Sequence, residues 1–173
     1  MHVLEAGEKG KPMLLLLHGF PSSSHMFRDL IPRLAARYHV IAPDYPGFGN
    51  SSAPAPEAFA YNFANLATLM DEFVTTIGVD RYALYMQDYG GPIGIRLAIR
   101  HPERVRALVV QNAVANVEGW NPAIVKGFAP GWANRTTETE KAFRGAFTAE
   151  ATKFQYIEGV SRTDRIDPDA WIR

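Results

Sequence analysis

The chain contains no cysteine, which excludes a disulfide scaffold, a thiolate nucleophile and a thiolate-bound metal. Its charges cancel at 18 Lys and Arg against 18 Asp and Glu, so no net positive field favours nucleic acid or an anionic membrane. The longest unbroken aliphatic run, residues 13–17, is far shorter than the roughly 20 residues needed to span a bilayer. The N-terminus lacks the regions of a signal peptide. We therefore expect a soluble, cytoplasmic protein with no nucleic-acid or membrane partner.

The 173 residues, of which 47% are hydrophobic, have an ordinary globular composition. Short apolar runs that are nearly continuous rather than alternating are typical of parallel strands covered on both faces. These runs lie at residues 2–5, 13–17, 38–42, 82–86 and 105–111. Helical periodicity separates them at 62–77, at 27–34 (where Pro32 interrupts it) and at 90–100. Strands that alternate with helices predict an α/β domain.

The last third of the chain differs, because no convincing strand follows Ala113. Thr137-Glu138-Thr139-Glu140 has the pattern of a capping box and predicts one helix whose apolar residues extend to Ile157. We expect the aromatic residues of that helix to pack on the rest of the protein. Asp167-Pro168 predicts the start of another helix.

Residues 85–91 (YMQDYGG) carry the strongest site signal. A strand runs into Asp88, and two glycines open a helix at once, which is the arrangement of a nucleophile elbow. The same pattern is compatible with Asp88 acting only as a helix N-cap. A second turn, His18-Gly19-Phe20-Pro21, ends an apolar strand some seventy residues earlier. Such a turn can place a backbone N–H beside the elbow, where it would form an oxyanion hole with the N–H of Tyr89.

Three segments in order resemble the α/β-hydrolase superfamily: HGFP at 18–21, VIAPDYPGFGNS at 40–51 and QDYGGPIGIRLAIRHPERV at 87–105. The chain looks most like the Asp-nucleophile branch, which contains the haloalkane dehalogenases and epoxide hydrolases. The resemblance implies an α/β-hydrolase fold, with a mostly parallel sheet and flanking helices. Residues 1–113 would form the N-terminal part of the core and 114–173 the start of a helical cap, while the C-terminal strands would be absent from this chain.

The resemblance also implies roles for individual residues. Asp88 matches the nucleophile, and Phe20 and Tyr89 match the oxyanion donors through their backbone N–H groups. Asp44 matches a structural position, and Phe20-Pro21 is a candidate cis peptide bond. No metal or cofactor is implied. The residues expected to support the site structurally are His18, Gly19, Pro21, Gly90 and Gly91.

An Asp nucleophile suits attack on an sp3 carbon, because a carboxylate with a pKa near 3.9 is already ionised at neutral pH. Displacing a halide or opening an epoxide would give an alkyl ester on Asp88. Water activated by a histidine would then attack the ester carbonyl, and the oxyanion hole would stabilise the tetrahedral state. The expected substrates are small, largely apolar molecules of the epoxide or haloalkane type.

Several residues of this chain differ from the family pattern, and these differences narrow the range of expected substrates. Dehalogenases usually carry Trp where this chain has Tyr89, and often Asn or Glu where it has Phe20. Fluoroacetate dehalogenases carry Arg where Tyr89 and Pro92 stand. Epoxide hydrolases share the HGFP form and use cap tyrosines, for which Tyr156 is the candidate here. Tyr156 and Trp120 could contact substrate, but packing at the boundary of cap and core is the simpler interpretation of Tyr156, and Trp120 could equally pack within the cap.

The catalytic triad is incomplete in this sequence. In the family the histidine follows the nucleophile along the chain, and only His101 does so here. His101 lies about 15 Å along the helix from the elbow and cannot be the triad base. Two hypotheses remain: part of an Asp-nucleophile hydrolase, or a truncated, non-catalytic binding or interaction module. A serine esterase is disfavoured, because no serine occupies the elbow.

Residues 105–111 would form an exposed apolar strand at the edge of the sheet. We therefore expect the 173-residue chain to be poorly soluble, or to pair with another chain or segment that completes the sheet.

Overall fold

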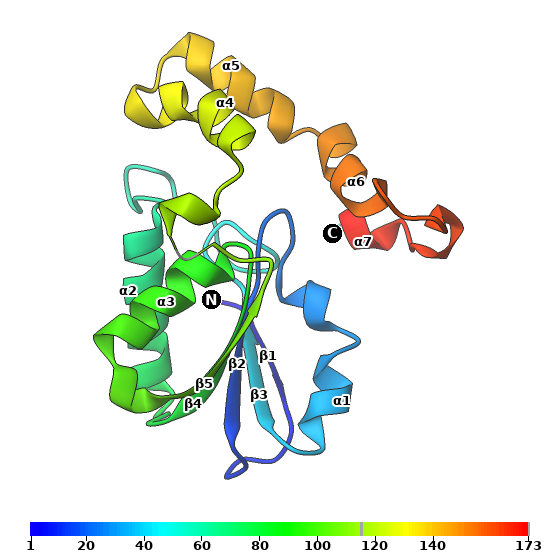
Figure 1. The fold of residues 1–173 in the computed structure, drawn as a ribbon. Helices are drawn as coiled ribbons and strands as arrows, with labels where there is room; N and C mark the ends of the chain where they lie inside the picture. The colour runs from blue at the N-terminus through cyan, green and yellow to red at the C-terminus, as the bar shows by residue number, and fades with distance from the viewer. Residues whose placement is uncertain (115, 173) are drawn as a thin grey trace. The chain divides into compact units, whose positions relative to one another are not determined.

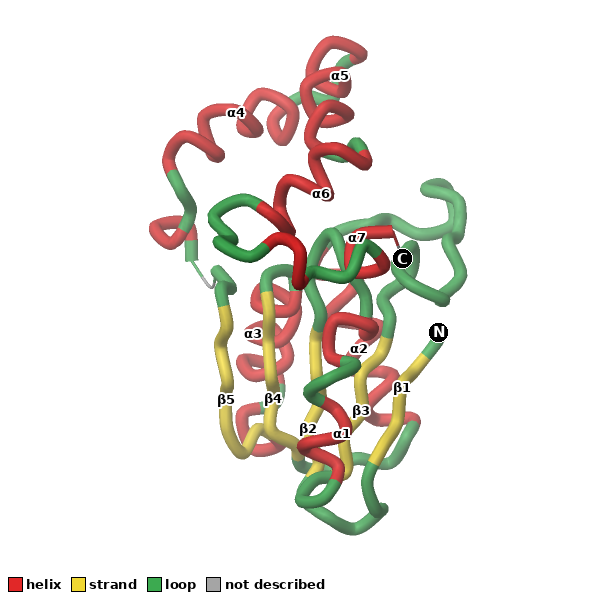
Figure 2. The backbone as a smooth tube through the Cα atoms, turned by 90° about the vertical axis from the view of Figure 1, so that its right-hand side faces the viewer, coloured by secondary structure: helices red, strands yellow, loops and turns green. Residues whose placement is uncertain are grey.

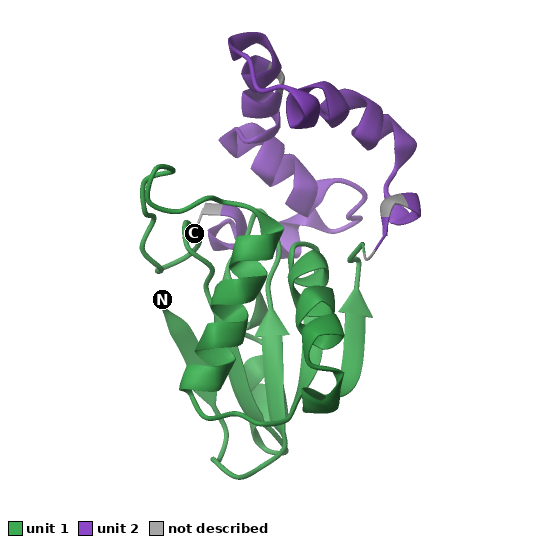
Figure 3. Ribbon diagram, turned by 90° about the vertical axis from the view of Figure 1, so that its left-hand side faces the viewer, with its two compact units in different colours: residues 1–115 green, residues 116–173 purple. Residues whose placement is uncertain are grey.

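The computed structural model describes residues 1–114 and 116–172. The chain divides into two compact units, Met1–Ala115 and Asn116–Arg173 (Figure 3). Within the described residues, no helix is both long and apolar enough to cross a membrane.

The first unit is built on a five-stranded sheet in the order β1-β3-β2-β4-β5 (Figure 2). Strand β1 is antiparallel to β3, and the other neighbouring pairs are parallel. Each strand lies within one or two residues of a predicted run, which confirms the mostly parallel sheet. The bounds are β1 Val3–Ala6, β2 Met13–Leu17, β3 His39–Pro43, β4 Tyr82–Gln87 and β5 Val105–Gln111.

Helices cover both faces of this sheet (Figure 1). Helix α1 (Ile31–Ala35) lies on one face, and α2 (Phe63–Thr76) and α3 (Gly90–Arg100) lie on the other. The central strand β2 is buried along its whole length. Leu14 and Leu16 belong to the core on the α1 side, whereas Met13, Leu15 and Leu17 belong to the core under α2 and α3. Burial on both faces explains why this run is continuous rather than alternating.

Local sequence signals set the helix ends. The Asn62 side chain accepts a hydrogen bond from the Asn65 N–H at 2.9 Å and so caps α2. Gly78 follows α2 with a φ of 70°, the left-handed conformation that is common just after a helix C-terminus. Pro32 lies in the first turn of α1, where the missing N–H costs no helical bond. The stretch before it forms only a short 3-10 helix, Ser24–Phe27.

The described part of the second unit contains helices joined by short loops, and no strand. Its α-helices are α4 (Pro122–Ala133), α5 (Thr137–Ala146), α6 (Ala149–Ile157) and α7 (Asp169–Ile172), and 3-10 turns lie at Val117–Gly119 and Thr163–Arg165. One more 3-10 turn, Pro102–Arg104, precedes β5 in the first unit.

Two sequence predictions for the second unit are wrong in detail. The capping box begins one residue earlier than predicted, because Thr136 and Thr139 exchange side-chain and backbone hydrogen bonds at 3.2 and 2.9 Å. The predicted single helix is two helices, because Thr148 caps α6 by accepting from the Ala151 N–H at 3.1 Å. The Thr148 cap therefore divides the continuous apolar pattern into two helices.

Strand β5 is the exposed edge that the sequence predicted. Within the described residues it pairs only with β4, and it stands at the end of the sheet. Leu108, Val109 and Val110 keep 46%, 44% and 55% of their surface exposed. Its one charged residue is Arg106, so little opposes pairing with another strand.

We predict that the 173-residue chain self-associates through β5. Val110→Lys should shift the chain toward monomer in light scattering, because a charge on the edge opposes strand pairing. Ile99→Lys is the matched control: Ile99 is 73% exposed, but it lies on α3 rather than on an edge strand. A monodisperse wild-type monomer, or the same shift in both variants, would contradict the prediction.

Candidate active site

Asp88 lies at the C-terminal end of β4, between the last residue of the strand and the start of α3. Its φ of 47° is in the left-handed region. For a non-glycine residue this conformation costs about 1–2 kcal/mol, and Asp is one of the few residues that adopt it. The backbone therefore makes the sharp strand-to-helix turn that the sequence predicted, and Asp88 is not simply a relaxed N-cap.

Glycines let three segments meet at this turn. A Cβ added at Gly90 would lie 2.2 Å from the Leu17 carbonyl oxygen, and one at Gly91 would lie 2.6 Å from the Ala113 Cβ. A Cβ at Gly19 would lie 2.4 Å from the Cβ of Asp88. All three glycines are required by close approach, because a side chain at any of them would overlap a neighbouring segment.

Phe20 provides a direct contact to Asp88. Its backbone N–H donates to Asp88 Oδ1 at 2.8 Å, and the Phe20-Pro21 peptide bond is cis. The turn after β2 therefore brings one of the two predicted oxyanion donors to the carboxylate. The role of the Tyr89 N–H as the second oxyanion donor stays a prediction.

His18 supports this turn from inside the core. It is fully buried, and its Nε2 accepts a hydrogen bond from the Tyr45 N–H at 3.2 Å. Its Nδ1 must then carry the proton, which it donates to the Gly19 carbonyl at 3.0 Å. Burial lowers the pKa of His18, and this outweighs the opposing effects of Gly19 and Asp44. A neutral ring with both nitrogens engaged is suited to positioning the Phe20 N–H.

His18 should make stability depend on pH. Its pKa is lowered in the folded state, so below the ordinary value of 6.5 the unfolded chain binds a proton that the folded chain does not. The free energy of unfolding should fall by up to about 1.4 kcal/mol per pH unit from pH 6.5 down to the folded pKa, and be unaffected by His18 above pH 6.5. Denaturant unfolding of wild type and His18→Asn at a series of pH values measures this. An equal slope in both proteins would contradict it.

Asp44 holds together the loops behind the site. Its buried carboxylate accepts from the Ser24 N–H at 2.7 Å, the Asn50 N–H at 3.0 Å and His2 Nδ1 at 2.9 Å. Burial acts to raise the pKa of Asp44, but the hydrogen bonds from Asn50, Ser24 and His2 outweigh it and lower that pKa. Because its carboxylate already accepts these three hydrogen bonds, Asp44 has the structural role that the resemblance implied.

Three aromatic rings surround the ring of Tyr89, the residue that follows Asp88. The ring of Tyr89 stacks on Phe20 at a centroid distance of 5.9 Å and meets Phe48 and Phe63 edge-on at 6.2 and 5.0 Å. Sequence reasoning did not single out Phe48 or Phe63. Only their positions in the chain could have indicated that they lie near the site. Phe48 lies in the loop after β3, and Phe63 is the first residue of α2. Loops at the C-terminal edge of a parallel sheet meet in space.

The family model for the alpha/beta hydrolase fold matches residues 12–155 of this sequence. The chain belongs to the α/β-hydrolase fold family.

Relatives of this α/β-hydrolase chain include an uncharacterised hydrolase of Saccharomyces cerevisiae, which is 37% identical over 172 residues, or 96% of this chain and 58% of that protein. Haloalkane dehalogenase 2 of Mycobacterium tuberculosis is 43% identical over 101 residues, or 58% of this chain and 35% of that protein. The chain thus spans less than two thirds of these relatives.

Solved structures agree with the family. A reconstructed ancestral haloalkane dehalogenase matches with a TM-score of 0.68 at 28% identity, covering 88% of this chain and 52% of that one. The epoxide hydrolase CorEH matches with a TM-score of 0.66 at 26% identity, covering 84% and 50%. The α/β-hydrolase fold predicted from the three motifs is therefore confirmed.

Other predicted residues lie elsewhere in this α/β-hydrolase chain. His101 follows the last residue of α3, and its Nε2 lies 3.0 Å from Asp71 Oδ2 on α2, so it is engaged at the end of the helix remote from Asp88. Trp120 packs against Trp132 at 5.8 Å, and Tyr156 against Trp171 at 6.3 Å, within the second unit. A substrate-binding role for Trp120 and Tyr156 stays a prediction.

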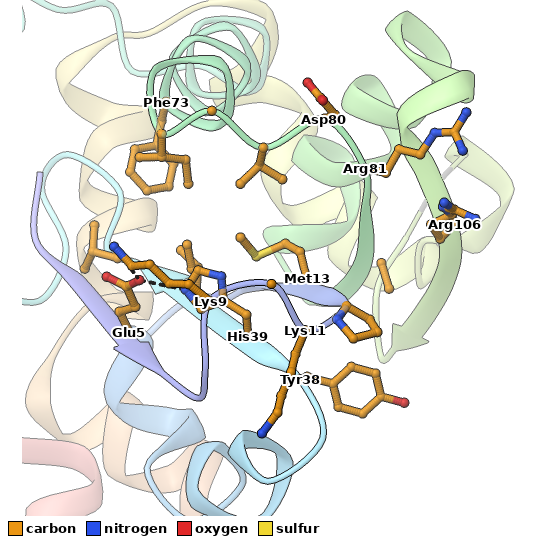
Figure 4. A pocket seen from close by; sticks show the side chains of 18 of the residues that line it. Glu5, Lys9, Lys11, Met13, Tyr38, His39, Phe73, Asp80, Arg81 and Arg106 are labelled. Atoms are coloured by element: carbon orange, nitrogen blue, oxygen red, sulfur yellow. Dashed lines mark hydrogen bonds and ion pairs between the residues drawn. The ribbon is translucent and has the colours of Figure 1, made fainter.

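The large cavity of this α/β-hydrolase unit is not at the elbow. It has a volume of about 1130 Å³ and is lined by residues at the opposite ends of the parallel strands, Met13 among them (Figure 4). At one side Glu5 pairs with His39 at 2.6 Å and with Lys9 at 3.8 Å (Figure 4). Glu5, His39 and Lys9 are therefore engaged with one another at this side of the cavity. Among the described residues, no cluster of three or more His, Asp or Glu side chains could hold a metal ion.

Proposed function

We propose that this chain carries the nucleophile of a hydrolase that acts on small, largely apolar substrates of the epoxide or haloalkane type. The observation that carries the proposal is the Asp88 carboxylate, held on a strained turn with the Phe20 N–H 2.8 Å from its Oδ1. Relatives and structural neighbours named as haloalkane dehalogenases and an epoxide hydrolase support the same substrate chemistry.

The first step would be attack by Asp88 on an sp3 carbon. Because Phe20 holds Oδ1, the other carboxylate oxygen, Oδ2, is the one available for attack. A C–O bond forms to Oδ2, and the bond from the carbon to the halogen or epoxide oxygen breaks, with its electron pair leaving on that atom. The aromatic rings around Tyr89, the residue after Asp88, provide an apolar surface that suits such a substrate.

The second step would be hydrolysis of the alkyl ester. Attack of water at the Asp88 carboxyl carbon places negative charge on the oxygen that the Phe20 N–H already faces. The step also requires a base to activate the water, and the described position of His101 does not provide one. We therefore expect the 173-residue chain to form the ester faster than it hydrolyses it, so that the ester accumulates.

Intact-mass spectrometry tests the proposal. The folded chain, checked first by circular dichroism, is incubated with a reactive aryl epoxide or an alkyl iodide. A single covalent adduct with the mass of the added alkyl group is expected. A folded chain that gains no adduct with either reagent overturns the proposal and favours the non-catalytic binding module.

A further inference from the structure

The cavity of about 1130 Å³ at the strand ends opposite the elbow takes no part in the proposed function. It is large enough for a small organic molecule, because ligand pockets usually enclose about 300–1,000 Å³. Apolar side chains from three strands and from the C-terminal end of α2 form much of its wall: Val3, Met13, Ile41, Phe73, Ile77 and Val79.

The charged side chains that line this cavity are predominantly basic. Four are cationic and two are anionic, which leaves a net charge of +2 with His39 neutral: Lys9, Lys11, Arg81 and Arg106 against Glu5 and Asp80. At one side, Glu5 is engaged with Lys9 and His39. Lys11 is engaged with Glu8, at 3.4 Å. The excess positive charge therefore belongs to the other side of the cavity.

Arg81 and Arg106 supply this excess charge. Both are exposed, and among the residues that the structure describes neither guanidinium makes a hydrogen bond or an ion pair. Figure 4 shows the two arginines on the same side of the cavity, away from Glu5, Lys9 and His39. Two unpaired cations at the rim of a largely apolar cavity suit a ligand that has an anionic head and an apolar body.

The backbone brings the two arginines together. Tyr82 of β4 pairs with Val105, whereas the next residue of β4 pairs with Ala107. Arg106 is therefore an extra residue in β5, a β-bulge, which is a device that re-aims a side chain. Because Arg81 directly precedes Tyr82, strand geometry places the Cα atoms of the two arginines roughly 8 Å apart. Two side chains as long as arginine can hold one anion between them over that distance.

We propose that this cavity binds a soluble phosphate monoester, whose phosphate lies between Arg81 and Arg106 and whose apolar body lies along the wall that contains Met13 and Phe73. A guanidinium donates paired N–H groups in the geometry that phosphate oxygens accept. A phosphate monoester carries a charge of about −1.5 to −2 at pH 7, which two arginines match, whereas a carboxylate carries only one charge. The inference is independent of the proposed function, because the cavity and Asp88 lie at opposite ends of the strands.

Isothermal titration calorimetry of the folded chain tests the ligand chemistry with three probes: octyl phosphate, inorganic phosphate and octanoate. Octyl phosphate should bind at one site per chain. It should bind about 100-fold more tightly than inorganic phosphate, because each buried methylene contributes about fourfold and the wall can cover several. Octanoate should bind about tenfold more weakly than octyl phosphate, because its head carries less charge.

Two substitutions test the location of the site. Arg81→Gln and Arg106→Gln should each weaken the binding of octyl phosphate by about tenfold, the effect of one lost charge-assisted hydrogen bond. Arg33→Gln is the matched control, because Arg33 is exposed on α1, outside the cavity lining, and the substitution removes the same charge. It should bind octyl phosphate as tightly as wild type.

Several results would overturn the inference. These are no saturable binding of octyl phosphate, equal binding of octyl and inorganic phosphate, or equal binding by all three arginine variants. Octanoate that binds as tightly as octyl phosphate would overturn the assignment of a phosphate head. Because Arg106 lies on β5, light scattering accompanies each titration. Weaker binding that is confined to Arg106→Gln and follows a change in its association would place the anion at the strand edge, and would also overturn the inference.

Discussion

Asp88→Asn is expected to lower the rate of ester formation by about 10³-fold or more, because the amide lacks the charged oxygen that attacks the carbon. Asparagine keeps an oxygen that can accept from the Phe20 N–H, and it tolerates the left-handed conformation at a φ of 47°. The fold and the elbow should therefore survive, and the loss should be chemical rather than structural. Intact-mass time courses of wild type and variant measure it.

Asp29→Asn is the control for this substitution, because the Asp29 side chain is 84% exposed and lies outside the elbow. Its ester should form at the wild-type rate. If Asp88→Asn reacts as fast as Asp29→Asn, the adduct forms on another group and Asp88 is not the nucleophile.

Gly90→Ala is expected to destabilise the first unit by about 2–4 kcal/mol, a large part of the stability of a small domain. The new Cβ would lie 2.2 Å from the Leu17 carbonyl oxygen and 2.8 Å from its carbon. These are backbone atoms of the central strand β2, which is hydrogen-bonded on both sides and cannot move aside cheaply. Either α3 must shift away from the sheet or the elbow must distort. Denaturant unfolding followed by circular dichroism measures the loss.

Gly127→Ala supplies the comparison. Gly127 lies in α4, and an added Cβ there meets no atom within 4 Å. Alanine should gain about 0.5–1 kcal/mol through its higher helix propensity. Equal effects of the two substitutions would show that the contact of α3 with β2 is not tight, which would contradict the packing described for the elbow.

The sheet could be predicted from the sequence because its signals are local. The apolar run of β2 is continuous, since both its faces are buried, and Asn62 and Gly78 mark the ends of α2. The elbow could also be predicted, because a strand, Asp88 and two glycines follow one another directly. Each of these features depends on neighbours in the chain.

Contacts through space were missed, and one local signal, the position of a helix cap, was misread. Phe48 and Phe63 join Tyr89 only because the loop after β3 and the start of α2 meet at the edge of the sheet. In the second unit, the apolar pattern predicted one helix, but the Thr148 cap divides it into α5 and α6. Several threonines could act as caps, and hydrogen-bond geometry rather than spacing decided among them.

The most direct test of the account is to locate the adduct. The chain that has reacted with an aryl epoxide is digested, and the modified peptide is fragmented by tandem mass spectrometry. We predict one modified residue, Asp88, within the peptide that joins β4 to α3. An adduct on any other carboxylate of the folded chain, or one that persists on the same peptide in Asp88→Asn, would contradict it.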